Sequence, residues 1–237
     1  MPADESTRGP ASQTLSRGIR ILEVLADARE PLTIDGVAER LGVHRSIAYR
    51  LLRTLEDHGL VARDAGGRVS LGARMAALAA GVAHDLQAEA LPELTAAANE
   101  LGMTCFISVL DREECVTLVS VEPRHAVASV AQRPGTRHPV GIGAPGKVIQ
   151  AARAESAWPI DLDDAHRAEL REARARGWAT SHDEVVPGLR SIAVPLSLPR
   201  GERAAVAVVY LADPRTDEQI AARITQVARA IRAALGG

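Results

Sequence analysis

A run near the N-terminus, TIDGVAERLGVHRSIAYRLLRTLEDHG (residues 33–59), admits few folds other than two short amphipathic helices joined by a tight turn. Thr33 is a favourable N-cap for the first helix. Gly42 and Gly59 are favourable ends for the two helices, because glycine readily takes the left-handed conformation that closes many helices. Apolar residues recur at helical spacing on both sides of the turn and predict one buried stripe on each helix: Ile34, Val37, Ala38 and Leu41, then Ile47, Ala48, Leu51, Leu52 and Leu55.

The flanking residues extend this helix pair into a small domain, which we predict to span residues 13–72. Residues 16–28 predict a preceding helix with Ile19, Leu22 and either Val24 or Leu25 on its apolar side. Two short β-like runs, LVARD and RVSLG, flank a glycine pair and predict a hairpin. Three helices followed by a hairpin form a winged helix-turn-helix. Residues 1–12 are polar and are expected to form a disordered tail.

The charge pattern distinguishes a DNA-binding domain from a purely structural three-helix domain. The net charge of -2 excludes a globally basic nucleic-acid binder, so any basic surface must be local. No carboxylate lies between Arg40 and Leu55, whereas an ordinary exposed helix mixes both signs of charge. We therefore favour binding of double-stranded DNA through residues near the start of the third helix and on the hairpin. The candidate contacts are Thr33, His44, Arg45, Ser46, Tyr49, Arg50, Arg53 and Arg68.

Residues 73–100 are alanine-rich and predict linker helices, with Pro92 tolerated in the first turn of the second helix. Small side chains let helices approach closely. We therefore favour a linker that also makes a dimer contact over a plain spacer.

Residues 101–237 mix strands and helices. The runs TCFISVL, CVTLVSVE, AVASVAQ, SIAVPLSL and AAVAVVYLAD predict strands, and helices are expected at roughly 146–155, 165–176 and 216–235. Because several strands follow one another directly, the pattern predicts an α+β domain with a mixed or antiparallel sheet rather than a doubly wound fold.

The stretch GIGAPGKV (141–148) partly matches a phosphate-binding P-loop, whose backbone N–H groups and lysine hold phosphates. The next position should carry a hydroxyl group for magnesium, but it is Val148. The preceding RPGTRHPV contains two prolines and would not form the buried strand from which a P-loop extends. ATP binding is therefore disfavoured, and Lys147, the only lysine in the chain, needs another role.

Four segments in order resemble the IclR family of bacterial transcriptional regulators. They are SRGIRILEVLAD, the helix–turn–helix and hairpin run LTIDGVAERLGVHRSIAYRLLRTLEDHGLVARDAGGRVSLG, HPVGIGAPGKVIQAA, and RGWATSHDEVVPGLRSIAVPL. The resemblance covers residues 14–235. It implies an N-terminal winged helix-turn-helix, a linker helix and a C-terminal GAF-like domain that binds a small effector. It also implies a homodimer or dimer of dimers on a palindromic operator, often as a repressor of catabolic genes.

The resemblance further implies an effector pocket between the GAPGK loop and the WATSHDEVVPGLRS segment. N–H groups at a helix N-terminus can accept an anion, although Pro145 removes one donor. Ser191 stands where some members have cysteine. With few aromatic side chains available to stack on a ring, we favour a small organic acid. For each candidate, a buried packing role remains the alternative to ligand contact: Cys105, Phe106, Val127, Val130, Gly143, Ala144, Pro145, Gly146, Ser181, Asp183 and Ser191.

Other functions find little support in the sequence. No apolar run is long enough to span a bilayer and no signal peptide is visible, so we expect a cytoplasmic protein with no membrane partner. Cys105 and Cys115 lie in apolar runs and are expected to be buried thiols. Neither a cofactor nor a catalytic motif is predicted. Whether His138 and His182 meet at a metal site is left open by the sequence. The alternatives to a regulator are a sensor or an enzyme that uses the C-terminal cavity with no DNA output.

Overall fold

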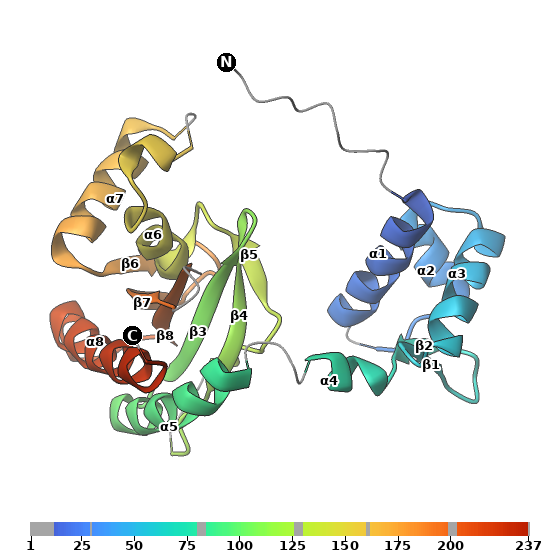
Figure 1. Cartoon of the computed structure of the whole chain (residues 1–237), viewed down its shortest axis with the longest axis horizontal. Coiled ribbons are helices and arrows are strands. Elements are labelled where there is room, and N and C mark those ends of the chain that lie inside the picture. The colour runs from blue at the N-terminus through green and yellow to red at the C-terminus, as the bar shows by residue number, and fades with distance from the viewer. Residues whose placement is uncertain are drawn as a thin grey trace. The chain divides into compact units, whose positions relative to one another are not determined.

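The computed structural model describes residues 12–28, 30–79, 84–125, 130–159, 162–198 and 203–236. Contacts divide the chain into two compact units, one up to residue 82 and the other from residue 83. Figure 1 shows the order of helices and strands along the chain. The predicted α+β class is confirmed, with a winged helix-turn-helix unit followed by a sheet-containing unit. The exact domain boundaries stay predictions.

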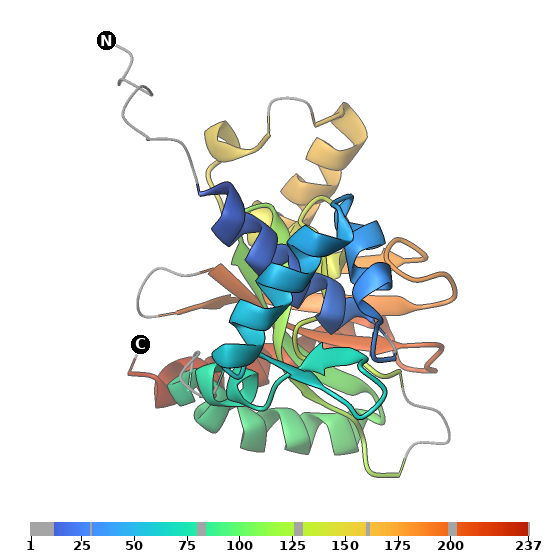
Figure 2. The same cartoon turned by 90° about the vertical axis from the view of Figure 1, so that its right-hand side faces the viewer.

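The N-terminal unit packs three helices against a two-stranded antiparallel hairpin, seen as blue helices and a teal hairpin in Figure 2. Its small core is built from both helices of the helix–turn–helix, the preceding helix and the hairpin, with Ile21, Val37 and Leu52 fully buried. Its elements are α1 (Gln13–Asp27), α2 (Ile34–Leu41), α3 (Arg45–Asp57), β1 (Val61–Arg63), β2 (Val69–Leu71) and α4 (Arg74–Ala79).

The predicted buried side of the first helix was partly wrong. Ile19 is 49% exposed, whereas Leu25, one of the two predicted alternatives, is buried and Leu22 packs against the core. Ile21, which was not predicted, is fully buried. The spacing of four between Ile21 and Leu25 places them on one side of α1. Ile19 lies two residues before Ile21, and residues two apart on a helix do not share a face.

The C-terminal unit contains a six-stranded sheet in the order β5-β4-β3-β8-β7-β6, and every neighbouring pair is antiparallel. A short 3-10 helix at Glu155–Ala157 precedes α7. The elements are α5 (His84–Leu101), β3 (Thr104–Asp111), β4 (Glu114–Val121), β5 (Arg137–Pro139), α6 (Gly143–Ala151), α7 (Asp164–Arg176), β6 (Ala179–His182), β7 (Arg190–Ser197), β8 (Arg203–Tyr210) and α8 (Asp217–Ala234).

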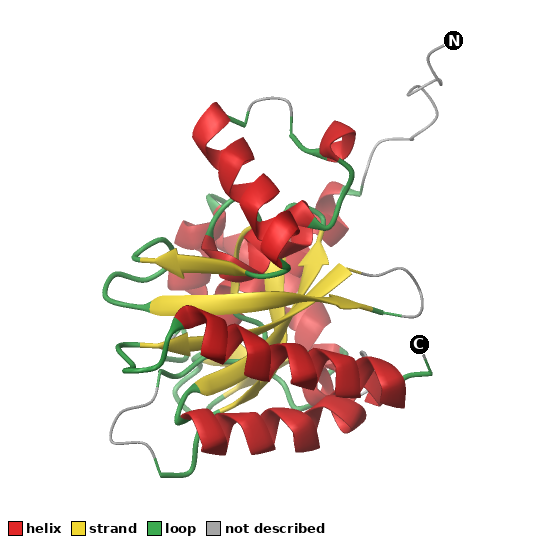
Figure 3. Cartoon of the chain, turned by 90° about the vertical axis from the view of Figure 1, so that its left-hand side faces the viewer, coloured by secondary structure: helices red, strands yellow, loops and turns green. Residues whose placement is uncertain are grey.

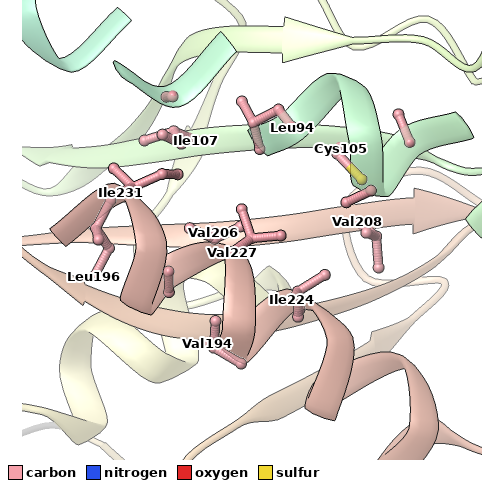
Figure 4. Close-up of a cluster of buried hydrophobic side chains, with 14 of the residues drawn as sticks. Leu94, Cys105, Ile107, Val194, Leu196, Val206, Val208, Ile224, Val227 and Ile231 are labelled. Atoms are coloured by element: carbon pink, nitrogen blue, oxygen red, sulfur yellow. The ribbon is translucent and has the colours of Figure 1, made fainter. Parts of the chain in front are cut away.

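Helices cover both faces of this sheet. Helices α5 and α8 lie side by side over one face (Figure 3) and bury a large apolar cluster there. Figure 4 shows Leu94 of α5 and Ile224 of α8 in this cluster with Ile107 and Val206 of the central strands. Helix α6 packs on the opposite face, against alanines of β7 and β8. Because successive strand residues point to opposite faces, neighbours in one strand enter different cores.

Several predicted elements differ from the structure. Residues 130–132, the described part of the expected strand 126–132, are not in a strand. Two short strands at the sheet edges, β5 and β6, were missed. Helix α6 ends at Ala151, earlier than expected. Pro92 lies in the middle of α5 and not in a first turn. Its ring removes a helix N–H, and the affected Ala88 lies on the exposed side, where water can replace that donor.

Candidate functional site

The turn between α2 and α3 fixes how α3 presents its surface. Thr33 caps α2 as predicted, its Oγ1 accepting from the Gly36 N–H at 3.1 Å. Gly42 ends α2 in the left-handed conformation, with φ of 64°, and its N–H bonds back to α2. His44 then caps α3 by accepting from the Ser46 N–H. The chain therefore reverses within a few residues and starts α3 at Arg45.

The outer side of α3 carries exposed polar and basic side chains. Ala48 and Leu52 hold its inner side in the core at 0% exposure, which leaves the opposite side to solvent. All eight residues predicted to contact DNA are exposed: Thr33, His44, Arg45, Ser46, Tyr49, Arg50, Arg53 and Arg68.

One carboxylate reaches this basic side from a neighbouring helix. Asp35, in the first turn of α2, places Oδ1 2.9 Å from Arg45 Nε, and both side chains are well exposed at 70% and 66%. The linear sequence around α3 lacks carboxylates, but the fold supplies one. An exposed ion pair of this kind contributes only about 0–1 kcal/mol, so Arg45 can exchange Asp35 for another anion.

The hairpin is attached to α3 and carries Arg68 at its tip. Asp64 Oδ1 accepts the Arg68 N–H at 2.8 Å, and Gly67 turns the chain with φ of 76°. Arg63 on β1 pairs with Glu56 near the end of α3 at 3.2 Å. These contacts hold the tip in a defined conformation while the Arg68 side chain stays exposed.

A small cavity in the C-terminal unit lies beside the start of α6. Its volume is about 50 Å3, and side chains from α6, the central strands and the β6–β7 connection line it. Of the predicted effector contacts, five line this cavity: Phe106, Gly143, Pro145, Ser181 and Ser191. The Ser191 hydroxyl is buried with no hydrogen-bond partner in the described chain. The other lining residues were not named as individual effector contacts, although several belong to the predicted WATSHDEVVPGLRS wall; they include Gln132, His138, Val185, Val186, Leu189 and Arg190.

Other predicted effector contacts lie elsewhere. Cys105 was predicted to line the effector pocket, but it is fully buried in the cluster beneath α5 and α8 (Figure 4). Strand alternation turns its side chain away from the face that Phe106 joins. Ala144 packs in the core on the α6 side. The Val130 carbonyl accepts the Thr104 hydroxyl at 2.7 Å. Val127 lies outside the described residues.

Gly146 and Asp183 have local structural roles. A Cβ on Gly146 would overlap the Val140 carbonyl oxygen, so glycine is needed for α6 to pack against that backbone. Asp183 has a positive φ of 62°, and its carboxylate accepts the Gly188 N–H within the β6–β7 connection. Both residues shape the surroundings of the cavity without lining it.

Lys147 pairs with two carboxylates of the protein. Its ammonium lies 2.6 Å from Glu184 Oε1 and 2.9 Å from Glu169 Oε2, and the residue is only 7% exposed. Burial by itself lowers the pKa of Lys147, but hydrogen bonds and charge from Glu184 and Glu169 outweigh it, so the pKa is raised above its ordinary value. The Gly143 N–H donates to the other oxygen of Glu184 at 2.9 Å.

The remaining candidate groups show little chemistry of their own. Both cysteines are free and buried, and burial raises the pKa of each thiol to about 12. His138 lines the small cavity, whereas His182 pairs with Asp183. Within the described ranges, no three His, Cys, Asp or Glu side chains gather closely enough to hold a metal ion. Asp163 caps α7, accepting the His166 N–H at 2.7 Å.

The helical part of the first unit matches a known family model. The model of the IclR helix-turn-helix domain covers residues 14–65. The glycerol operon regulatory protein of Streptomyces griseus is 30% identical over 218 residues, which cover 85% of this chain and 85% of that protein. The sequence similarity thus extends well beyond the DNA-binding unit.

Solved structures share the fold over nearly the whole chain. An IclR transcriptional regulator from Alicyclobacillus acidocaldarius has a TM-score of 0.83 at 28% identity, covering 96% of this chain and 100% of that one. An IclR homologue from Microbacterium hydrocarbonoxydans, solved with 4-hydroxybenzoate, has a TM-score of 0.81 at 24% identity, covering 94% and 99%. In the part of the chain that the structure describes, helices are too short or too polar to cross a membrane.

Proposed function

The chain belongs to the IclR family of transcriptional regulators, and we propose that it represses a catabolic operon until a small organic acid binds its C-terminal unit. DNA binding and transcriptional regulation are the shared activity of this family's relatives. The repressor role, the class of effector and the contact residues are our proposals. We also propose that the protein acts in the cytoplasm and needs no cofactor or membrane partner.

The exposed basic side of α3 is the observation that carries the DNA-binding proposal. Recognition helices of this type enter the major groove with their N-terminal residues on base edges. Arg45, Ser46, Tyr49 and Arg50 occupy that half of α3 and are exposed. In the proposal they contact bases or phosphates, while His44, Arg53 and Thr33 contact the backbone. Arg68 reaches the adjacent phosphates from the hairpin.

A palindromic operator would be read by two copies of the chain. Half-sites on one face of a duplex lie about 34 Å apart or a multiple of that, so both reading helices must keep a fixed separation. We propose a homodimer or a dimer of dimers whose linker helices set that separation. Effector binding then weakens the complex with DNA by changing the separation of the two reading helices, so that they no longer bind both half-sites at once.

The effector proposal rests on the cavity beside α6. Phe106 and the apolar side chains of the β6–β7 connection line one part of it, and Ser181, Ser191 and His138 supply polar groups. Ligand sites commonly combine an apolar wall with a few polar groups. The relative solved with 4-hydroxybenzoate and the relative named for a glycerol operon support a small catabolic metabolite as the ligand.

Fluorescence anisotropy with a duplex from upstream of the chain's own gene tests the regulator against its alternatives. A regulator binds this duplex with an affinity that falls steeply with added salt, because phosphate contacts release counterions. A sensor that signals only through protein contacts shows no salt-sensitive DNA association. An enzyme turns over a small acid to a detectable product, which chromatography of the incubated metabolite reveals.

A further inference from the structure

The start of α6 is occupied by a carboxylate of the protein itself. Glu184 accepts the Gly143 N–H with Oε2 at 2.9 Å and the Lys147 ammonium with Oε1 at 2.6 Å. This helix N-terminus and the ammonium beside it are the groups that would attract an anionic ligand. In the ligand-free chain, both are bonded to one internal acid.

Glu184 also connects two neighbouring spaces. Gly143 lines the cavity of about 50 Å3, whereas Lys147 and Glu184 line an adjoining cleft of about 370 Å3. Ser181, Arg190 and Ser191 border both spaces. Pockets for drug-sized ligands commonly measure about 300–1,000 Å3, so the small cavity by itself has room only for a very small metabolite. Glu184 thus bonds to a group from each space, the Gly143 N–H and the Lys147 ammonium.

The charges around Lys147 favour an incoming carboxylate that replaces Glu184 over one that binds beside Glu184. The Lys147 ammonium already faces two carboxylates, Glu184 and Glu169, so a third anion placed beside them would be repelled. An incoming carboxylate that replaces Glu184 keeps the charge balance and recovers the same two hydrogen bonds. Glu184 is 27% exposed and belongs to a surface connection, so its released carboxylate can reach water.

We propose that Glu184 is a specificity-determining residue: it holds the anion position in the ligand-free chain, and a small monocarboxylate binds by exchanging with it. This inference rests on the proposed function, because it concerns the same effector site. Exchange selects ligands that carry a carboxylate, since an uncharged amide cannot replace Glu184 on Lys147 without losing an ion pair. Exchange also couples ligand occupancy to the conformation of the β6–β7 connection, where Val185 and Val186 line the small cavity.

Calorimetric titration with matched acids and amides tests this exchange. The probes are acetate, propionate and butyrate and their primary amides, applied to the full chain and to Glu184→Gln. We expect Glu184→Gln to bind the acids about 10-fold more tightly, because the internal competitor loses its charge. Affinity for the amides should stay nearly unchanged.

Two further glutamate variants separate exchange from a general charge effect. Glu169→Gln removes the other carboxylate from Lys147 but leaves Glu184 on the Gly143 N–H, so its gain for acids should be clearly smaller. Glu155→Gln removes the same charge from an ion pair with Arg171 and should change nothing. Glu184→Asp is the substitute if Glu184→Gln does not fold, since its shorter side chain cannot span both partners.

Three outcomes would overturn the proposal. The first is equal acid affinity in the unmodified chain and Glu184→Gln, and the second is an equal gain for acids and amides. The third is no saturable binding of any acid to either protein. DNA affinity is measured separately on the same samples, so loss of the regulator function and loss of the exchange are distinguishable.

Discussion

Arg45 at the start of α3 is held by Asp35 in the first turn of α2, with 2.9 Å between Nε and Oδ1. A phosphate that binds Arg45 must compete with this carboxylate and is also repelled by it. We expect Asp35→Asn to bind the upstream duplex several-fold more tightly at low salt, with the difference fading as salt screens the charge. Anisotropy titrations at several salt concentrations measure this.

Asp27→Asn is the control for that substitution, because it removes the same charge from the end of α1. It should leave the affinity nearly unchanged. An equal gain in both variants would mean that overall charge and not the Arg45 contact is responsible.

Arg50 is expected to be a direct DNA contact. It is exposed on the outer side of α3, opposite the buried Ala48 and Leu52. Arg50→Ala should weaken binding by roughly 1–3 kcal/mol if the guanidinium contacts a base with two hydrogen bonds. The matched control is Arg229→Ala on the exposed side of α8. A gel-shift titration with unchanged affinity for Arg50→Ala would remove this residue from the interface.

Gly146 is expected to be a packing requirement and not a ligand contact. A Cβ there overlaps the Val140 carbonyl oxygen, so α6 must move or distort. We expect Gly146→Ala to lower the free energy of unfolding by about 1–3 kcal/mol, as overpacking does in other cores. Gly141→Ala is the control, because nothing lies within 4 Å of the added Cβ. Chemical denaturation should find the two variants clearly different; equal stabilities would refute the packing role.

The two thiols should be inert in the folded protein and affect stability at high pH. Burial raises the pKa of Cys105 and Cys115 to about 12, from 9.0. As the pH rises above 9, the thiols ionise in the unfolded chain before they do so in the folded one. Their contribution to stability is therefore complete below pH 9 and is lost towards pH 12. A thiol reagent at pH 8 should label neither cysteine until denaturant is added; rapid labelling beforehand would contradict this burial.

The sequence predicted the N-terminal unit well because its signals are local. Thr33, Gly42 and the apolar stripes each act within a few residues, and the structure confirms all three. Ile19 was misplaced because several apolar residues of α1 fit a helical spacing, and only packing decides which are buried. The Asp35–Arg45 pair joins two helices across a turn, which no charge count along α3 reveals.

In the C-terminal unit, contacts between residues far apart in the sequence determine features that local sequence patterns do not reveal. Strands β5 and β6 are short, and β5 contains Pro139, so only their neighbours in the sheet make them strands. Cys105 and Phe106 are adjacent and apolar, so they point to opposite faces of the sheet, but which of them faces α6 depends on how the helices pack on the sheet. The partners of Lys147 were also missed. A lone lysine in an apolar run was the available signal that carboxylates must come from elsewhere, here from α7 and the β6–β7 connection.

The absence of any lysine besides Lys147 limits how this regulator can be controlled. Lysine acetylation neutralises charge on many DNA-binding surfaces, but every strong cation on the outer side of α3 is an arginine. Guanidinium groups remain charged throughout the physiological pH range. The arginine charges that we propose to attract a duplex are therefore independent of acyl-donor metabolism, which leaves ionic strength and the proposed ligand among the variables that would set release from the promoter.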